Sequence, residues 1–138
     1  MDNRVTLLGL WESGWLEPKV EAFLWRQLVS AYAVDELVLC PQLLAPRTNL
    51  EQFNSVGDAL PQLHGEHVLL DPNEGESLAD FVHPQEAVYI FGRAGDDNRR
   101  WAKDATFVRI VTPAPVDFFA LHAAAIVLYD RETKRGNR

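Results

Sequence analysis

The stretch that decides the fold is Val5-Thr6-Leu7-Leu8-Gly9-Leu10, a short apolar run typical of a buried strand. From Pro18 the apolar residues recur at helical spacing as far as about Val34, and Pro18 suits the first turn of a helix. Glu36-Leu37-Val38-Leu39-Cys40 follows directly and indicates a second strand, which Pro41 stops. A strand, a helix and a strand in this order favour a crossover between two parallel strands.

Three further apolar runs continue this pattern and predict strands over 67–70, 87–91 and 106–111. A short helix is expected around 50–60, and a closing helix from Asp117, which can cap it, to Tyr129. Strands that alternate with helices predict an α/β fold, a mostly parallel sheet with helices on both faces. Ligands of such sheets bind outside the carboxyl ends of the strands, so the loops after Leu70, Phe91 and Val111 are the first candidates for a site.

The composition indicates one folded domain. The chain has 138 residues, and 47% of them are hydrophobic, enough to form a core of its own. We expect this domain over 1–130 and a basic tail over 131–138. No apolar run approaches the length of a membrane span, and no signal segment is recognisable, so we expect a cytoplasmic protein. The single Cys40 excludes an internal disulfide and suits a buried apolar position.

The charge is unevenly distributed. The chain has a net charge of −7, which ordinarily argues against a nucleic-acid partner. Residues 1–90 contain four basic and fourteen acidic residues, whereas 91–138 contain nine basic and six acidic residues. An anionic partner should therefore contact the C-terminal third, although such asymmetry is equally compatible with an ordinary solvated surface.

Several segments resemble the motifs of the SpoU-like (SPOUT) trefoil-knot RNA 2′-O-methyltransferases. Tyr89-Ile90-Phe91-Gly92 is similar to that family's strand-to-loop motif, and Val108-Arg109-Ile110-Val111-Thr112 to its Val-x-Ile-Pro-Met stretch. The segment 121–130 resembles its closing helix. In the family's first motif an Asn is followed six residues later by an Arg, and Arg26 occupies that Arg position.

The resemblance implies a site for S-adenosylmethionine and a trefoil knot near the C-terminus. Backbone groups of the loops would bind the adenine of the methyl donor, and Ile90, Ile110 and Phe118 would supply apolar walls. Arg26 would be catalytic, holding the phosphate next to a ribose 2′-hydroxyl of tRNA or rRNA and favouring the deprotonated hydroxyl. The family's substrate site is built across two subunits, which implies a homodimer through the C-terminal helix. The complete set expected to bind the donor is Leu70, Ile90, Phe91, Gly92, Ile110, Val111 and Phe118.

Three departures from the family pattern leave a second hypothesis open. Val20 replaces the Asn of the first motif, Arg93-Ala94 replaces Pro-Glu, and Asp117-Phe118-Phe119 stands where Ser-Leu-Asn is usual. Each lost polar group would have positioned the substrate, the catalytic Arg or a neighbouring loop. The alternative is therefore a module that keeps the fold and binds RNA or S-adenosylmethionine without transferring a methyl group. A nucleotide-binding open sheet is disfavoured, because no glycine-rich phosphate loop is present.

The remaining candidates are basic, aromatic and histidine residues. Arg93, Arg99 and Arg100 flank the expected donor loop and are candidates for contact with RNA phosphates. Trp11 and Trp15, after the first strand, are candidates for contact with a ligand or a partner subunit. His122 is interpreted as a core or interface residue. We expect no metal, because the three histidines at 64, 67 and 83 lack the further ligands of a tetrahedral site.

Overall fold

The structure is a computed structural model that describes residues 3–12, 17–40, 51–52, 55–92, 99, 102, 104–114 and 116–136. Seven parallel strands form one sheet in the order β3-β2-β1-β6-β4-β7-β5. Their bounds are β1 Arg4–Leu10, β2 Glu36–Cys40, β3 Glu51–Gln52, β4 Glu66–Leu70, β5 Glu76–Ser77, β6 Glu86–Phe91 and β7 Thr106–Arg109. The expected α/β class is confirmed.

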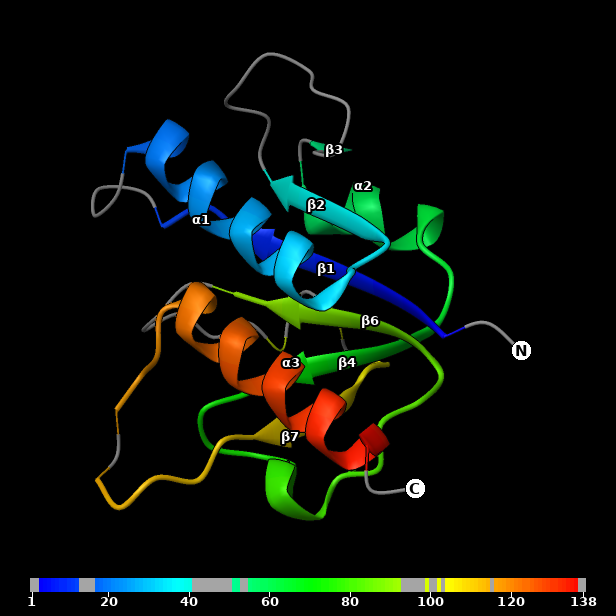
Figure 1. The fold of residues 1–138 in the computed structure, drawn as a ribbon, viewed down its shortest axis with the longest axis vertical. Coiled ribbons are helices and arrows are strands. Elements are labelled where there is room, and N and C mark those ends of the chain that lie inside the picture. Colours follow the sequence, from blue (N-terminus) through cyan, green and yellow to red (C-terminus); the bar gives the residue numbers. More distant parts are fainter. Residues whose placement is uncertain are drawn as a thin grey trace.

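Two long helices cover one face of the sheet and a short helix covers the other. Helices α1 (Pro18–Tyr32) and α3 (Ala120–Gly136) lie side by side over the centre of the sheet (Figure 1). Helix α2 (Val56–Ala59) and the 3₁₀ helix η1 (Leu60–Gln62) pack on the opposite face. A second 3₁₀ helix, η2 (Leu78–Asp80), follows β5. The arrangement has three layers, with the sheet in the middle.

The alternation of side chains along the strands sorts the core into two clusters. In β1, Leu7 joins the cluster under α1 and α3, whereas Leu8 joins the cluster under α2. In β6, Tyr89 and Phe91 face the first cluster, and Ile90 faces the second. The strands are continuous apolar runs because both faces of the sheet are covered.

The first crossover matches the sequence expectation closely. Helix α1 begins at Pro18 and is followed by Ala33 in the left-handed conformation, with φ 50° and ψ 46°. The Ala33 and Val34 N–H groups both donate to the carbonyl of Val29, which ends the helix before β2. Cys40 is fully buried, as expected.

The later elements differ from expectation at their ends. Strand β7 stops at Arg109, so Ile110 and Val111 belong to the following loop. Helix α3 begins at Ala120, three residues after the expected cap Asp117, and continues to Gly136. It runs through most of the expected tail because polar contacts described below hold its last turns. The helix expected at 50–60 is shorter, and its start is capped by Ser55 Oγ, which accepts the Asp58 N–H at 3.1 Å.

Among the described residues no helix has the length and apolar character to cross a membrane. The trefoil knot stays a prediction from the resemblance.

Candidate functional site

Three of the expected loops start side by side at the carboxyl edge of the sheet. Strand β4 lies between β6 and β7, with Leu69 opposite Ile90 and Leu70 opposite Val108. One residue further, the Asp71 N–H donates to the Val108 carbonyl at 2.9 Å. The segments after the three strands therefore begin within one small region, as parallel pairing requires.

The expected donor-binding residues divide between the two faces of the sheet. Leu70 and Phe91 are buried in the cluster under α1 and α3, and Ile110 and Phe118 pack half-buried against it. Ile90 lies in the other cluster because it alternates with Phe91 along β6. Its side chain therefore cannot form one wall with Ile110 and Phe118, although its backbone lies at the same edge. This is a correction to the wall expected from the sequence.

The two other expected positions lie next to these walls. Gly92 is half-buried and follows directly after β6. Val111 is 59% exposed, in the loop after β7. Its side chain lies at the surface, next in the chain to the half-buried Ile110.

Helix α1 meets the carboxyl edge through Trp25. The Trp25 indole lies against Gly9, where an added Cβ would come within 3.0 Å of its Cζ2 atom. Its ring centroid is 6.1 Å from that of Phe91. Glu21, which is 1% exposed, accepts the Trp25 Nε1–H at 3.1 Å and the Glu12 backbone N–H at 2.9 Å. A buried carboxylate thus ties α1 to the end of β1, a role that the sequence pattern did not suggest.

Arg26, the expected catalytic residue, lies next to Trp25 in the middle of α1 and is half-buried. The simplest structural interpretation pairs it with a neighbouring carboxylate such as Glu21 or Glu17. The structure rules out the pair with Glu21, because Glu21 points into the protein and both of its oxygens accept other hydrogen bonds. In the described part of the chain, Arg26 forms no hydrogen bond or ion pair. Its guanidinium is free to bind a phosphate.

Arg99, an expected RNA contact, is held by two acidic residues of the loop after β4. Its Nη1 donates to Glu74 Oε1 at 2.5 Å, and its Nε lies 3.7 Å from Asp71 Oδ1. Asp71 also accepts the N–H groups of Asn73 and Glu74, so its carboxylate organises this turn. An RNA phosphate at Arg99 has to compete with Glu74. Arg93 and Arg100 lie outside the described residues.

A buried polar cluster lies at the other edge of the sheet, where the strands begin, and no sequence pattern indicated it. His83 Nδ1 lies 2.6 Å from the Tyr89 hydroxyl, and its Nε2 lies 2.7 Å from Asp130 Oδ2. Arg131 Nη1 donates to the same hydroxyl at 2.9 Å. His83 and Tyr89 are both buried. Only the general tendency of a buried tyrosine hydroxyl to find a partner could have pointed to this cluster.

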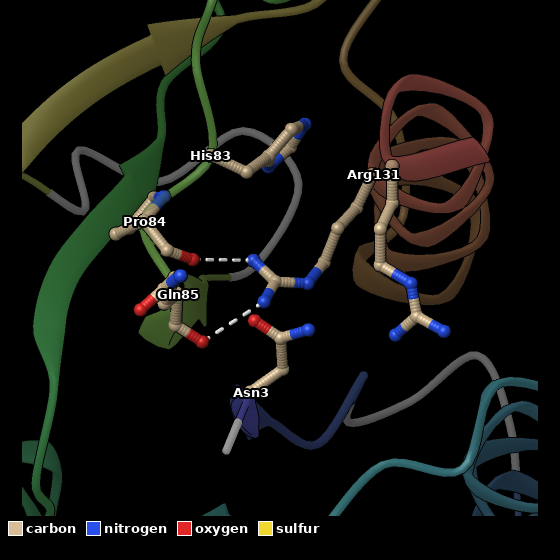
Figure 2. A pocket seen from close by; sticks show the side chains of 6 residues that line it. Asn3, His83, Pro84, Gln85 and Arg131 are labelled. Atoms are coloured by element: carbon tan, nitrogen blue, oxygen red, sulfur yellow. Dashed lines mark hydrogen bonds between the residues drawn. The ribbon is translucent and has the colours of Figure 1, made fainter. Parts of the chain in front are cut away.

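Two cations of α3 extend this cluster to the backbone. Figure 2 shows Arg131 reaching across to the segment before β6, where its Nη1 and Nη2 donate to the carbonyls of Pro84 and Gln85 at 2.6 and 3.0 Å. Lys134 donates to the carbonyls of Leu78 and Phe81 at 2.6 and 2.8 Å and pairs with Asp130. A pocket next to Arg131 is lined by Asn3, His83, Pro84, Gln85, Arg131 and Arg135 (Figure 2). These contacts explain why α3 continues beyond Asp130.

The hydrogen bonds of the cluster favour a neutral His83. Because Arg131 donates to the Tyr89 hydroxyl, that hydroxyl can donate its own proton to His83 Nδ1. Nε2–H then donates to Asp130. Burial lowers the pKa of His83 below its ordinary value, and Asp130 opposes the shift without cancelling it. Burial likewise raises the pKa of Tyr89, against the opposing effect of Arg131.

Two of the aromatic and histidine expectations are resolved. Trp11 is 1% exposed and belongs to the core under α1, so the expectation that it contacts a ligand is wrong. Trp15 lies outside the described residues. His122 is exposed on α3, so a place in the core of this chain is excluded, and an interface role stays a prediction. Among the described residues no group of three His, Cys, Asp or Glu side chains could hold a metal.

Solved structures share this fold over nearly the whole chain. One, described as giving structural insights into the 2-OH methylation of C/U34 on tRNA, is 17% identical, with a TM-score of 0.72 and 99% of each chain covered. The SpoU methyltransferase AviRb of Streptomyces viridochromogenes, in complex with AdoMet, is 14% identical with a TM-score of 0.73. An RNA 2′-O ribose methyltransferase is 16% identical with a TM-score of 0.72.

The chain covers different shares of these proteins. It aligns over 98% of its own length with both AviRb and the ribose methyltransferase, but this corresponds to 59% and 58% of their lengths. No protein-family model matches the sequence, and no curated protein matches it. The structural likeness establishes that the chain has the fold of the SpoU-like RNA methyltransferases.

Proposed function

We propose that the protein is an S-adenosylmethionine-dependent RNA methyltransferase that acts on a ribose 2′-hydroxyl of tRNA or rRNA. The observation that carries the proposal is the superposition of nearly the whole chain on solved RNA methyltransferases, one of them in complex with AdoMet. The free guanidinium of Arg26 and the meeting of three loops at the carboxyl edge support it independently of that likeness.

The residues at the carboxyl edge fit a methyl donor. Ile110 and Phe118 are half-buried at the margin of the core, which suits an apolar wall for adenine. Gly92 carries no Cβ, so the backbone there can approach a ligand closely. Leu70, Ile90 and Phe91 would contribute through their backbone groups, since their side chains are buried. When bound, S-adenosylmethionine supplies an activated methyl group.

Arg26 is the proposed catalytic residue. Its planar guanidinium can hold two oxygens of the phosphate next to the target ribose, which aligns the 2′-hydroxyl with the donor. The same positive charge favours the deprotonated hydroxyl. An arginine cannot act as a simple base at neutral pH, because its own pKa is far too high. Arg26 therefore acts by placing the substrate and by its electrostatic field.

Arg93, Arg99 and Arg100 are the proposed RNA contacts beside the donor loop. Only Arg99 belongs to the described residues, and its ion pairs with Glu74 and Asp71 hold it at the carboxyl edge. Because Glu74 is more than half exposed, a phosphate can replace it at small cost. RNA binding is therefore expected to weaken steeply with salt.

A homodimer is proposed from the outward faces of α1 and α3. These adjacent helices expose four large apolar side chains: Val20 (47%), Phe23 (62%), Ile126 (36%) and Tyr129 (64%). Large apolar side chains exposed on adjacent helices are typical of an association surface. A second copy that covers it would bring the α1 helices and their Arg26 residues close to the subunit boundary.

One observation favours a second candidate, a module that binds RNA or the donor without transfer. Val20, at the position where the family has an Asn, is exposed and offers no hydrogen bond. The polar group next to it, Glu21, already has partners for both oxygens. The position of the family's Asn thus supplies no polar group that could hold Arg26 toward a substrate.

The experiment that tests the proposal is transfer of a labelled methyl group from S-adenosylmethionine to bulk tRNA and rRNA. The enzyme hypothesis expects label in RNA, and digestion to nucleosides should place it on a ribose 2′-oxygen. Label on a base instead would contradict the assigned reaction. Donor and RNA binding without any label in RNA would establish the binding module.

A further inference from the structure

Three aromatic rings gather where α3 begins. The rings of Phe119 and His122 are stacked, with an interplanar angle of 7° and centroids 6.0 Å apart. Phe118 meets His122 edge-on, at 72° and 6.4 Å. His122 is exposed, whereas the two phenylalanines are half-buried. The exposed imidazole is therefore braced by two rings instead of extending freely into solvent.

The position of this aromatic cluster places it beside the proposed donor site. Phe118 packs against the same core cluster as Ile110, in the segment that joins β7 to α3. The start of α3 lies at the edge where β6 ends (Figure 1). When a ribose of the RNA reaches the donor, a base of the same or an adjacent nucleotide must lie close to this edge.

We propose that His122, stacked on Phe119, forms a platform on which an unpaired nucleobase of the RNA substrate stacks. The inference rests on the proposed function, because it names the part of the RNA that this edge recognises. Aromatic side chains bind unpaired bases through their faces, and such stacking tolerates any base. The C-terminal third, which contains the platform, is also the part of the chain with a net positive charge, which suits an RNA partner.

The nucleobase is favoured over a second copy of the chain as occupant. On α3 the face proposed for dimerisation consists of Ile126 and Tyr129, which lie one and two turns beyond His122 on the same exposed side of the helix, so the platform is the end of that side nearest the carboxyl edge. The platform lies at the start of α3 and consists of planar rings, whereas that face includes the branched side chains Val20 and Ile126. Stacked, pre-arranged rings lose little conformational freedom when a base binds, which favours a flat ligand.

The test is a fluorescence titration of a short single-stranded RNA that carries 2-aminopurine, with the wild type and with His122→Ala and Phe119→Leu. Stacking quenches 2-aminopurine, so the wild type should quench it. Each variant should bind about tenfold more weakly and quench less. His122→Phe keeps a stacking ring and should restore both. The matched control is His64→Ala, which removes another exposed histidine in the loop before β4 and should bind like the wild type.

Two accompanying measurements separate this inference from the proposed function. Affinity for S-adenosylmethionine, measured by calorimetry, should be the same in all variants, and thermal unfolding should show that each is folded. If the His122 and Phe119 variants bind RNA as tightly as the wild type, the platform is overturned, but the proposed function is not. Variants that change the oligomeric state instead would identify a second copy as the occupant and also overturn it. A wild type that binds no RNA would overturn the proposed function together with the platform.

Discussion

The two edges of the sheet are built from different chemistry. At the amino edge, where the strands begin, Arg131 and Lys134 of α3 donate to four backbone carbonyls. There His83 also forms hydrogen bonds with both Tyr89 and Asp130. At the carboxyl edge Ile110 and Phe118 are half-buried and Val111 is exposed, Arg99 pairs with the exposed carboxylate of Glu74, and Arg26 forms no hydrogen bond or ion pair with a described residue.

This difference separates what holds α3 in place from what remains available to a ligand. Polar groups that satisfy one another inside a protein stabilise one arrangement, but they have nothing left to offer a substrate. Half-buried apolar walls and an unpaired guanidinium contribute less to folding and more to binding. The last turns of α3 therefore serve as its anchor, and its first turn lies at the proposed site.

Replacing Arg26 should produce the largest effect, a loss of methyl transfer. We expect Arg26→Ala to reduce methyl transfer about 100-fold or more, because a charge that acts on the reacting hydroxyl is lost. Donor affinity should stay the same, since Arg26 is assigned to the RNA. Single-turnover transfer assays with tRNA or rRNA measure both points. Arg135→Ala, at the amino edge, is the control and should transfer at the wild-type rate; equal rates for Arg26→Ala and the wild type would refute the catalytic role.

Removing the anchor at the amino edge should act on stability instead. Arg131→Met leaves the carbonyls of Pro84 and Gln85 and the Tyr89 hydroxyl without this donor. The expected cost is about 3 kcal/mol of unfolding free energy, or a melting temperature lower by about 10 °C. Calorimetric melting measures it. Arg135→Met removes an exposed guanidinium 3.9 Å from Glu132 and should change little; similar losses in both variants would mean that the carbonyl contacts do not anchor α3.

Between these two edges, the outward faces of α1 and α3 should control assembly. Tyr129→Asp places a charge in the proposed dimer face, where the tyrosine is 64% exposed in one chain. We expect the dimer dissociation constant to rise at least about tenfold, which light scattering over a dilution series can follow. Val82→Asp is the control, because Val82 is an exposed apolar residue outside these two helices, in the segment between η2 and β6. A wild type that is monomeric at all concentrations would contradict the proposed face.

The smallest expected effect is a pH dependence of stability at the amino edge. The folded pKa of His83 is lowered, so its neutral form is favoured in the fold. Its contribution is complete above the unfolded value of about 6.5 and declines as the pH falls through the lower folded pKa. Between about pH 7.5 and 5.5 the wild type should therefore lose a few degrees more of melting temperature than His83→Gln. If the melting temperatures of the two proteins fall equally with pH, His83 does not contribute to stability in this way.

The fold was predictable because its signals are local. The apolar runs of β1, β2, β4 and β6, and the Pro18 start of α1, are visible in the sequence, and strand alternation with helices implies parallel pairing. The two-residue strands β3 and β5 were missed, because two residues are too few to show the alternation of apolar and polar side chains that marks a strand.

The site was predictable only in part. Because the strands are parallel, the sequence already implied that the three loops lie together. That Ile90 packs on the opposite face of the sheet from Ile110 and Phe118 becomes visible only in the folded structure. The cluster of His83, Tyr89 and Asp130 joins residues up to 47 positions apart, which no spacing rule reveals. The burial of Trp11 and Glu21 likewise follows from tertiary packing alone.

The most direct test of the central claim, that the carboxyl edge binds the methyl donor, is calorimetric titration with S-adenosylmethionine. The wild type and Arg135→Ala, changed only at the amino edge, should bind it alike. Gly92→Val should bind much more weakly, because its side chain fills the space where the backbone approaches the ligand. Absence of binding to the folded wild type at millimolar donor, or full binding by a folded Gly92→Val, would contradict the account.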